Sequence, residues 1–170
     1  RQMCIRDRSY TDYAIFLGIL DGGEDTSTDN DRVVAHAQGS TFSLSGILQN
    51  SSESKVDSLG STVTTQYLNL RGMGLRSGSV NGTLFNGVLL QNFENFDALL
   101  GTQNDQFTIN AMPVAGQLVS TRLSLGAGDD LVTINSVLGE TTVYGGFGAD
   151  QVTVNADQTL LPGILGNLNI

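Results

Sequence analysis

Residues 145–155 read GGFGADQVTVN, a glycine-rich turn that ends in an aspartate and leads into a short alternating stretch. The same phrase occurs twice earlier, as LGAGDDLVTIN over residues 125–135 and as LGTQNDQFTIN over residues 100–110. The copies share the aspartates Asp105, Asp130 and Asp150, which are spaced by 25 and then by 20 residues. A repeat of this length predicts a stacked architecture, in which each copy buries its apolar face against its neighbours.

Apolar residues follow each aspartate at alternate positions, with threonine between them. The apolar pairs are Phe107 and Ile109, Val132 and Ile134, and Val152 and Val154. Period-two alternation predicts a strand with one face inward and one face outward. Each stretch ends in an asparagine, a residue that tolerates turn conformations. If the strands stack in parallel, we expect the side chains of Asn110, Asn135 and Asn155 to form a ladder.

The turns combine glycines with carboxylates. Glycine permits positive φ and close backbone approach, and carbonyl and carboxylate oxygens are the ligands that Ca²⁺ prefers. Residues 145–153 fit the calcium-binding nonapeptide G-G-x-G-x-D-x-U-x at every specified position. Residues 125–133 lack only the first glycine, where Leu125 stands, whereas residues 100–108 keep Gly101, Asp105 and Phe107.

This pattern resembles the haemolysin-type (RTX) calcium-binding repeats, especially their degenerate relatives in very large secreted bacterial proteins. The resemblance covers residues 94–155 well and residues 21–93 loosely, and it implies that successive turns share calcium in a right-handed parallel β-roll or β-helix. The implied metal ligands are Gly126, Gly128, Asp129, Asp130, Gly146, Gly148, Asp150 and Asp105. The copies are 20–25 residues apart rather than in tandem, which favours wider coils. The alternative is that Gly and Asp act only as turn formers.

The remaining residues indicate an all-β chain, since no apolar residues recur at helical spacing over three turns. We expect strands at 13–20, 41–48, 61–70, 79–85, 88–91 and 96–99, with a polar loop at 50–54. Aromatic residues Phe93 and Phe96, with Leu100, are expected to fill a coil interior. Asp31 begins an Asp-x-apolar-x-apolar stretch and is interpreted as a fourth, eroded copy at the end of the acidic segment 21–31. That segment is either a second calcium cluster or a solvated loop.

Residues 1–8, RQMCIRDR, resemble a translated adapter of sequencing libraries that recurs at the ends of metagenomic contigs. We therefore set them apart and expect residues 9–170 to form a single β-solenoid fragment without natural ends. The only cysteine lies in this segment, and the chain carries a net charge of −9. An acidic chain without further cysteines is typical of a bacterial extracellular or cell-surface protein without disulfides. Its acidity argues against nucleic acid as a partner.

The sequence contains no run of eighteen apolar residues, so it predicts no membrane-spanning helix. Catalytic constellations are also not apparent: His36 is the only histidine, and no G-x-S-x-G motif occurs. The sequence therefore favours a non-enzymatic, calcium-stabilised structural repeat region, whose partners are calcium ions, neighbouring repeats of the same polypeptide, and cell-surface glycans or proteins. The alternative is an adhesin or carbohydrate-binding surface module. Less favoured is a fragment of a β-helix enzyme that modifies polysaccharides.

Overall fold

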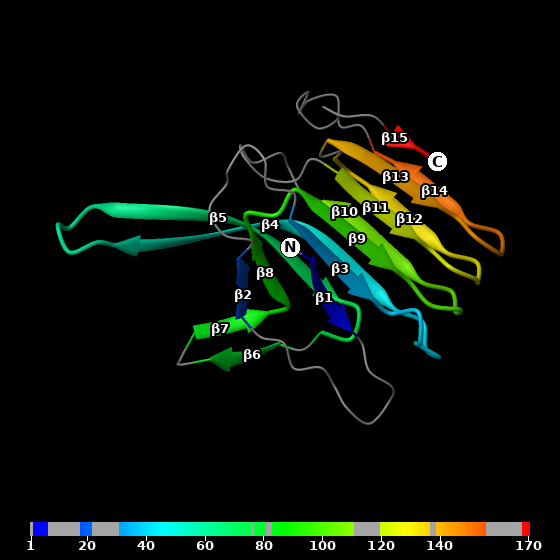
Figure 1. Cartoon of the computed structure of the whole chain (residues 1–170), viewed down its shortest axis with the longest axis horizontal. Helices are drawn as coiled ribbons and strands as arrows, with labels where there is room; N and C mark the ends of the chain where they lie inside the picture. Colours follow the sequence, from blue (N-terminus) through cyan, green and yellow to red (C-terminus); the bar gives the residue numbers. More distant parts are fainter. Residues whose placement is uncertain are drawn as a thin grey trace.

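The computed structural model describes residues 2–6, 18–21, 31–75, 77–80, 83–110, 120–136, 139–155 and 168–170. These residues form strands and turns without a helix, so the predicted all-β class is confirmed. It follows that none of them belongs to a helix long and apolar enough to cross a membrane. Two large sheets and one two-stranded sheet contain the strands (Figure 1).

One sheet has six strands, all paired in parallel, in the order β1-β3-β9-β11-β13-β15. These strands are β1 (Gln2–Arg6), β3 (Arg32–His36), β9 (Asn95–Leu99), β11 (Ser120–Ser124), β13 (Glu140–Tyr144) and β15 (Leu168–Asn169). The segment at 1–8 that we set apart on sequence grounds thus contributes strand β1, which pairs with β3.

The other large sheet has seven strands in the order β14-β12-β10-β4-β5-β8-β2. They are β14 (Gln151–Val154), β12 (Leu131–Ile134), β10 (Gln106–Asn110), β4 (Ser45–Val56), β5 (Thr62–Gly72), β8 (Val88–Gln91) and β2 (Gly18–Asp21). The pairs from β14 to β4 are parallel, as is β8 with β2, whereas β5 is antiparallel to both of its neighbours. A small antiparallel sheet joins β6 (Ser77–Val80) and β7 (Thr83–Asn86).

From β9 to β14 consecutive strands alternate between the two large sheets. Each odd-numbered strand in this range joins the six-stranded sheet and each even-numbered strand joins the seven-stranded sheet. The register aligns equivalent residues of the three copies, with Phe107 opposite Val132 and Val132 opposite Val152. The glycine turns that connect the sheets therefore lie one above the next at the same side of the molecule (Figure 1).

The core lies between the two large sheets, where each sheet contributes its inward face. Phe96 of β9 and Phe107 of β10 face each other with ring centroids 6.4 Å apart. Phe107 fits because Gly46 stands opposite it on β4, and a Cβ at Gly46 would lie 2.7 Å from the Phe107 ring. Close packing of this kind leaves a core intolerant of changes in volume.

The predicted inward positions are buried in the first two copies. Phe107, Ile109, Val132 and Ile134 are at most 1% exposed, and the expected interior residues Phe93, Phe96 and Leu100 are buried as well. In the third copy Val154 is 38% exposed, because β14 is the edge strand of its sheet. Alternation thus identified the inward face correctly, and the sheet edge explains the exception.

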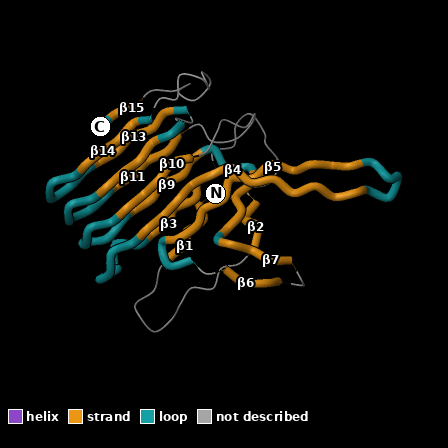
Figure 2. The backbone as a smooth tube through the Cα atoms, turned by 180° about the vertical axis from the view of Figure 1, so that it is seen from behind, coloured by secondary structure: helices purple, strands orange, loops and turns teal. Residues whose placement is uncertain are grey.

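Residues 50–54, in the middle of β4, depart most from the sequence-based expectation. The predicted polar loop at 50–54 is wrong, because these residues lie inside β4, which pairs with β5 from Gly46 opposite Gly72 to Val56 opposite Thr62. The two strands form a long ribbon that projects from the body of the molecule in both views (Figures 1 and 2). In the outer half of this ribbon, residues 50–56 and 62–66 are mostly polar and none of them is buried, so hydrophobic periodicity gives no signal there.

Other strand predictions agree more closely. The expected strands at 61–70, 88–91 and 96–99 correspond to β5, β8 and β9. The single strand expected at 79–85 is instead the antiparallel pair β6 and β7. Strand β2 covers the end of the stretch expected at 13–20, whose earlier residues lie outside the described ones, as do residues 22–30 of the acidic segment. Strands β11 and β13 were not anticipated.

Candidate functional site

The candidate site is the stack of glycine turns at 100–105, 125–130 and 145–150, each placed between a strand of the six-stranded sheet and one of the seven-stranded sheet. All eight residues predicted as metal ligands lie in this stack. We call these three segments the turn stack. They are aligned because the strands on either side of them pair in parallel with the same offsets of 25 and 20 residues.

Glycine is required in these turns for two reasons. Gly126, Gly128, Gly146 and Gly148 have φ values of +93°, +119°, +89° and +131°, which L side chains rarely adopt. In addition, a Cβ at Gly146 would lie 2.1 Å from the carbonyl oxygen of Gly126, and one at Gly148 would lie 1.9 Å from that of Gly128. Successive turns therefore touch backbone to backbone.

Backbone hydrogen bonds join the turns directly. The amide of Ala127 donates to the carbonyl oxygen of Gly101 at 3.2 Å, and that of Phe147 donates to the carbonyl oxygen of Gly126 at 2.9 Å. The amide of Gly128 donates to the carbonyl oxygen of Phe147 at 2.8 Å. The carbonyl of Gly126, expected as a metal ligand, therefore also holds the stack together.

The shared aspartates form a ladder through the turns. The Oδ1 atom of Asp130 accepts the backbone N–H of Asp105 at 2.7 Å, and Oδ1 of Asp150 accepts that of Asp130 at 3.1 Å. Asp105 in turn accepts the amides of Leu44 at 2.8 Å and Gly101 at 2.9 Å. Each carboxylate thus caps an amide of the preceding turn, which places like charges in one column.

A second ladder runs beside the first one. The amide of Asp129 donates to Oδ1 of Asn104 at 3.0 Å, and the amide of Ala149 donates to Oδ1 of Asp129 at 2.8 Å. Asp129 is exposed while Asp130 is 2% exposed. The two adjacent carboxylates therefore belong to separate ladders.

The expected asparagine ladder is confirmed at the far end of the strands. The Nδ2 atom of Asn135 donates to Oδ1 of Asn110 at 3.3 Å, and Nδ2 of Asn155 donates to Oδ1 of Asn135 at 3.0 Å. An asparagine side chain can donate a hydrogen bond to the preceding copy and accept one from the following copy, so the same residue type can form the ladder at every level.

Asp130 occupies the centre of the aspartate ladder. Its Oδ2 atom is buried and has no hydrogen-bond partner among the described residues. Burial raises the pKa of Asp130 above its ordinary value of 3.8; the hydrogen bond from the Asp105 amide lowers this pKa, and the charges of Asp105, Asp150 and Asp129 raise it again. The ion pairs of the described residues do not include Asp130, so no positive side chain among them balances its charge.

Among the described residues, the carboxylates do not converge on one point. Within the described residues, no three or more His, Cys, Asp or Glu side chains form a group that could hold a metal ion. The ladder explains this, because each shared aspartate accepts a backbone amide of the preceding coil instead of pointing toward a common centre. An ion between two turns would therefore take oxygens from two carboxylates and complete its shell with carbonyls and water.

The assignment of Asp31 as an eroded copy of the repeat is wrong. Arg32 pairs with Asn95 in the six-stranded sheet, so that Asp31 aligns with Glu94 and not with Asp105. The position equivalent to Asp105 in this coil is Leu44, because Gln106 pairs with Ser45. Asp31 precedes a strand of the six-stranded sheet, whereas Asp105 precedes a strand of the seven-stranded sheet. An aspartate followed by alternating residues therefore does not identify the sheet to which the strand belongs.

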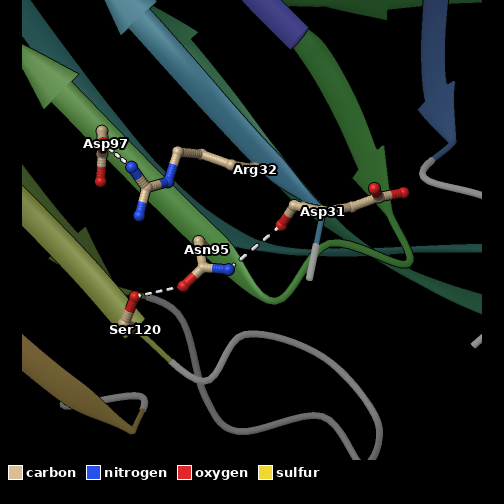
Figure 3. Close-up of polar contacts among 5 residues, drawn as sticks. All are labelled: Asp31, Arg32, Asn95, Asp97 and Ser120. Carbon is tan, nitrogen blue, oxygen red and sulfur yellow. Dashed lines mark hydrogen bonds and ion pairs between the residues drawn. The ribbon is translucent and has the colours of Figure 1, made fainter. Parts of the chain in front are cut away.

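Asp31 belongs instead to a row of polar contacts across β3, β9 and β11 (Figure 3). The Nδ2 atom of Asn95 donates to the carbonyl oxygen of Asp31 at 3.4 Å, and Oγ of Ser120 donates to Oδ1 of Asn95 at 2.7 Å. Nearby, the Arg32 guanidinium lies 3.6 Å from a carboxylate oxygen of Asp97. These contacts stitch the strands together and bring no acidic cluster to the turn stack.

No protein-family model, curated protein or solved structure matches this chain.

Proposed function

We propose that this chain is a non-enzymatic structural repeat region of a secreted or cell-surface bacterial protein, and that calcium ions stabilise its turn stack. In this proposal the alternating strands form a right-handed parallel β-solenoid with coils of about 20–25 residues. Support comes from the register offsets of 25 and 20 residues and from the alternation of strands between two sheets. The antiparallel β4–β5 ribbon is then an insertion between coils.

The observation that carries the calcium proposal is the buried, unpartnered Oδ2 atom of Asp130. This atom lies in a column where Asp105 and Asp150 occupy the adjacent levels. A negative charge buried among like charges is costly unless a cation balances it. Asp130 and Asp150, with Asp129 beside them, are the residues that would hold the ion, and a bound Ca²⁺ supplies charge neutralisation and a link between coils.

Calcium dependence would couple the folding of such a region to its export from the cell. Extracellular calcium-binding modules have dissociation constants of about 10⁻⁴ to 10⁻³ M. At those affinities the turn stack would be loaded outside a cell, where calcium is abundant, and empty inside it. Repulsion within the carboxylate column would then weaken the fold before export.

Calorimetric titration tests the proposal. We expect the unaltered chain to bind Ca²⁺ with a dissociation constant in the range given above, and Asp130→Asn to lose most of the heat of binding. Asp57→Asn is the matched control, because Asp57 lies at the exposed tip of the ribbon, where its Oδ1 accepts the amides of Leu59 and Ser61. Equal heats for the two variants, or the absence of binding to the unaltered chain, would remove calcium from the proposal.

A further inference from the structure

Among the described residues, no strand pairs with either edge of the outer half of the β4–β5 ribbon. Strand β10 pairs with β4 only over residues 45–49, and β8 pairs with β5 only over residues 68–70. Beyond these residues, the described part of the chain provides no further strand beside the ribbon. Figures 1 and 2 show the outer part of β4 and β5 extending beyond the other strands of both large sheets.

An isolated two-stranded ribbon is marginally stable in water, and an exposed strand edge is a template for another strand. The tip of this ribbon is built firmly, since Asp57 accepts the amides of Leu59 and Ser61. Around that tip Val56, Leu59 and Val63 are 70%, 88% and 52% exposed. A well-formed ribbon with exposed apolar side chains gains from a partner that extends the sheet.

The charges on β4 select the partner. Glu53 and Lys55 lie on the same face of the strand on either side of Ser54, with 3.5 Å between their charged groups. An antiparallel copy of β4 centred on Ser54 would place each Glu53 opposite a Lys55 of the other copy. A parallel copy in register would place Glu53 opposite Glu53, which is unfavourable.

We propose that two copies of this chain associate by antiparallel pairing of their β4 edges over residues 52–56, about a twofold axis at Ser54. The interface is isologous and closed, with two cross-strand ion pairs related by the axis. The sheet that results has four strands in the order β5-β4-β4-β5. In this register Asp57 of one copy falls opposite Ser51 of the other. The partner strand therefore ends before it reaches residues 45–49 of β4, which are already paired with β10.

The β5 edge does not offer the same selection. Its outer residues, 62–67, carry no charged side chain, so neither orientation nor register is favoured by charge. Pairing of a β4 edge with a β5 edge would also be heterologous and would continue into larger assemblies. The alternating charges about Ser54 therefore favour the closed dimer.

Sedimentation equilibrium of the full chain tests this proposal, with chelator present so that calcium cannot link molecules through the turn stack. We expect a monomer–dimer equilibrium for the unaltered chain. Lys55→Glu and Glu53→Lys each replace two attractive pairs by two repulsive ones, and each should weaken dimerisation about tenfold. The double variant carrying both changes should dimerise as the unaltered chain does, and an equimolar mixture of the two single variants should form heterodimers.

Circular dichroism of each variant checks that the fold is kept, which is expected because Lys55 is exposed, Glu53 is partly exposed, and an ion pair at the surface contributes little to stability. A chain that stays monomeric at all concentrations would overturn the proposal. So would dimerisation that is indifferent to the charge changes, or growth beyond dimers, which would indicate pairing through β5.

Discussion

The turn stack and the β4–β5 ribbon are both built from strands and glycine turns, yet they differ in what surrounds them. In the turn stack every level touches the next through backbone, and the phrase repeats because each level meets the same neighbour. In the ribbon, the outer halves of β4 and β5 are exposed to solvent on both faces. The difference teaches that a sequence repeat reports a repeated environment, whereas strand residues without a buried neighbour, such as 50–54 of β4, leave little trace in the sequence.

The largest contrast is expected for alanine at equivalent glycines of the two regions. Gly146 has φ +89° and its added Cβ would lie 2.1 Å from a backbone carbonyl, whereas Gly60 at the ribbon tip has φ +82° with nothing within 4 Å. Both variants lose stability because alanine is strained at a positive φ, but only Gly146→Ala must also push two turns apart. We expect a loss of about 4 kcal/mol in unfolding free energy for Gly146→Ala and about 1 kcal/mol for Gly60→Ala.

Urea denaturation measures both values. If the two glycine variants lost the same amount of stability, the backbone contact between turns would not be a determinant of the fold.

Core truncation should give the next largest contrast. Ile134 is fully buried between the large sheets, while Val56 is 70% exposed on the ribbon. Ile134→Ala should cost about 3 kcal/mol, and Val56→Ala should change stability by less than about 0.5 kcal/mol. Thermal unfolding of the two variants checks this, and a large loss from Val56→Ala would mean that the ribbon is covered in solution.

Asp130 should make the turn stack sensitive to pH when calcium is chelated. Its pKa is raised in the folded state above the ordinary value of 3.8, so the folded chain binds its proton more readily than the unfolded chain. Stability from this group therefore increases as the pH falls through the folded pKa toward 3.8. We expect the unaltered chain to gain stability relative to Asp130→Asn over that interval.

Thermal unfolding between pH 7 and pH 4 in chelator supplies the measurement. Taking the difference between the two chains removes the contribution of carboxylates that do not interact with Asp130, and a difference that does not change with pH would contradict the buried, charged state of Asp130.

The smallest contrast concerns side-chain ladders. Asn135 donates to Asn110 and accepts from Asn155, so Asn135→Ala breaks two exposed hydrogen bonds and should cost about 1 kcal/mol. In the ribbon, Ser54 shares one exposed hydrogen bond with Thr64, and Ser54→Ala should cost about 0.5 kcal/mol or less. Chemical denaturation of both variants checks the order, which would be reversed if the ribbon were the more tightly coupled region.

Sequence was informative where a residue meets the same environment at each level. The alternation after Asp105 and Asp130 identified the inward residues, and the spacing predicted the asparagine ladder. It was uninformative for residues 50–54, whose serines pair across a ribbon without a core. It was misleading at Asp31, because the pairing of Arg32 with Asn95 depends on a contact 63 residues away that no local pattern encodes.

Within the turn stack, the residues were predicted but their bonding was not. The motif located the carboxylates in turns, and the structure adds that each one caps an amide of the preceding coil. This arrangement could not be derived from spacing alone, because it requires the relative height of two turns. The unpartnered Oδ2 of Asp130 emerged only from that geometry.

The most direct measurement is the unfolding temperature of the unaltered chain in calcium and in chelator, with magnesium as the ionic control. For one site of the proposed affinity, 10 mM calcium should stabilise the fold by about 1.4 to 2.7 kcal/mol. For a chain of this size the unfolding temperature should therefore rise by roughly 3 to 10 °C, with little effect of magnesium. Equal unfolding temperatures in calcium and chelator would show that the aspartate ladder holds the turns without metal and would contradict the proposed calcium dependence.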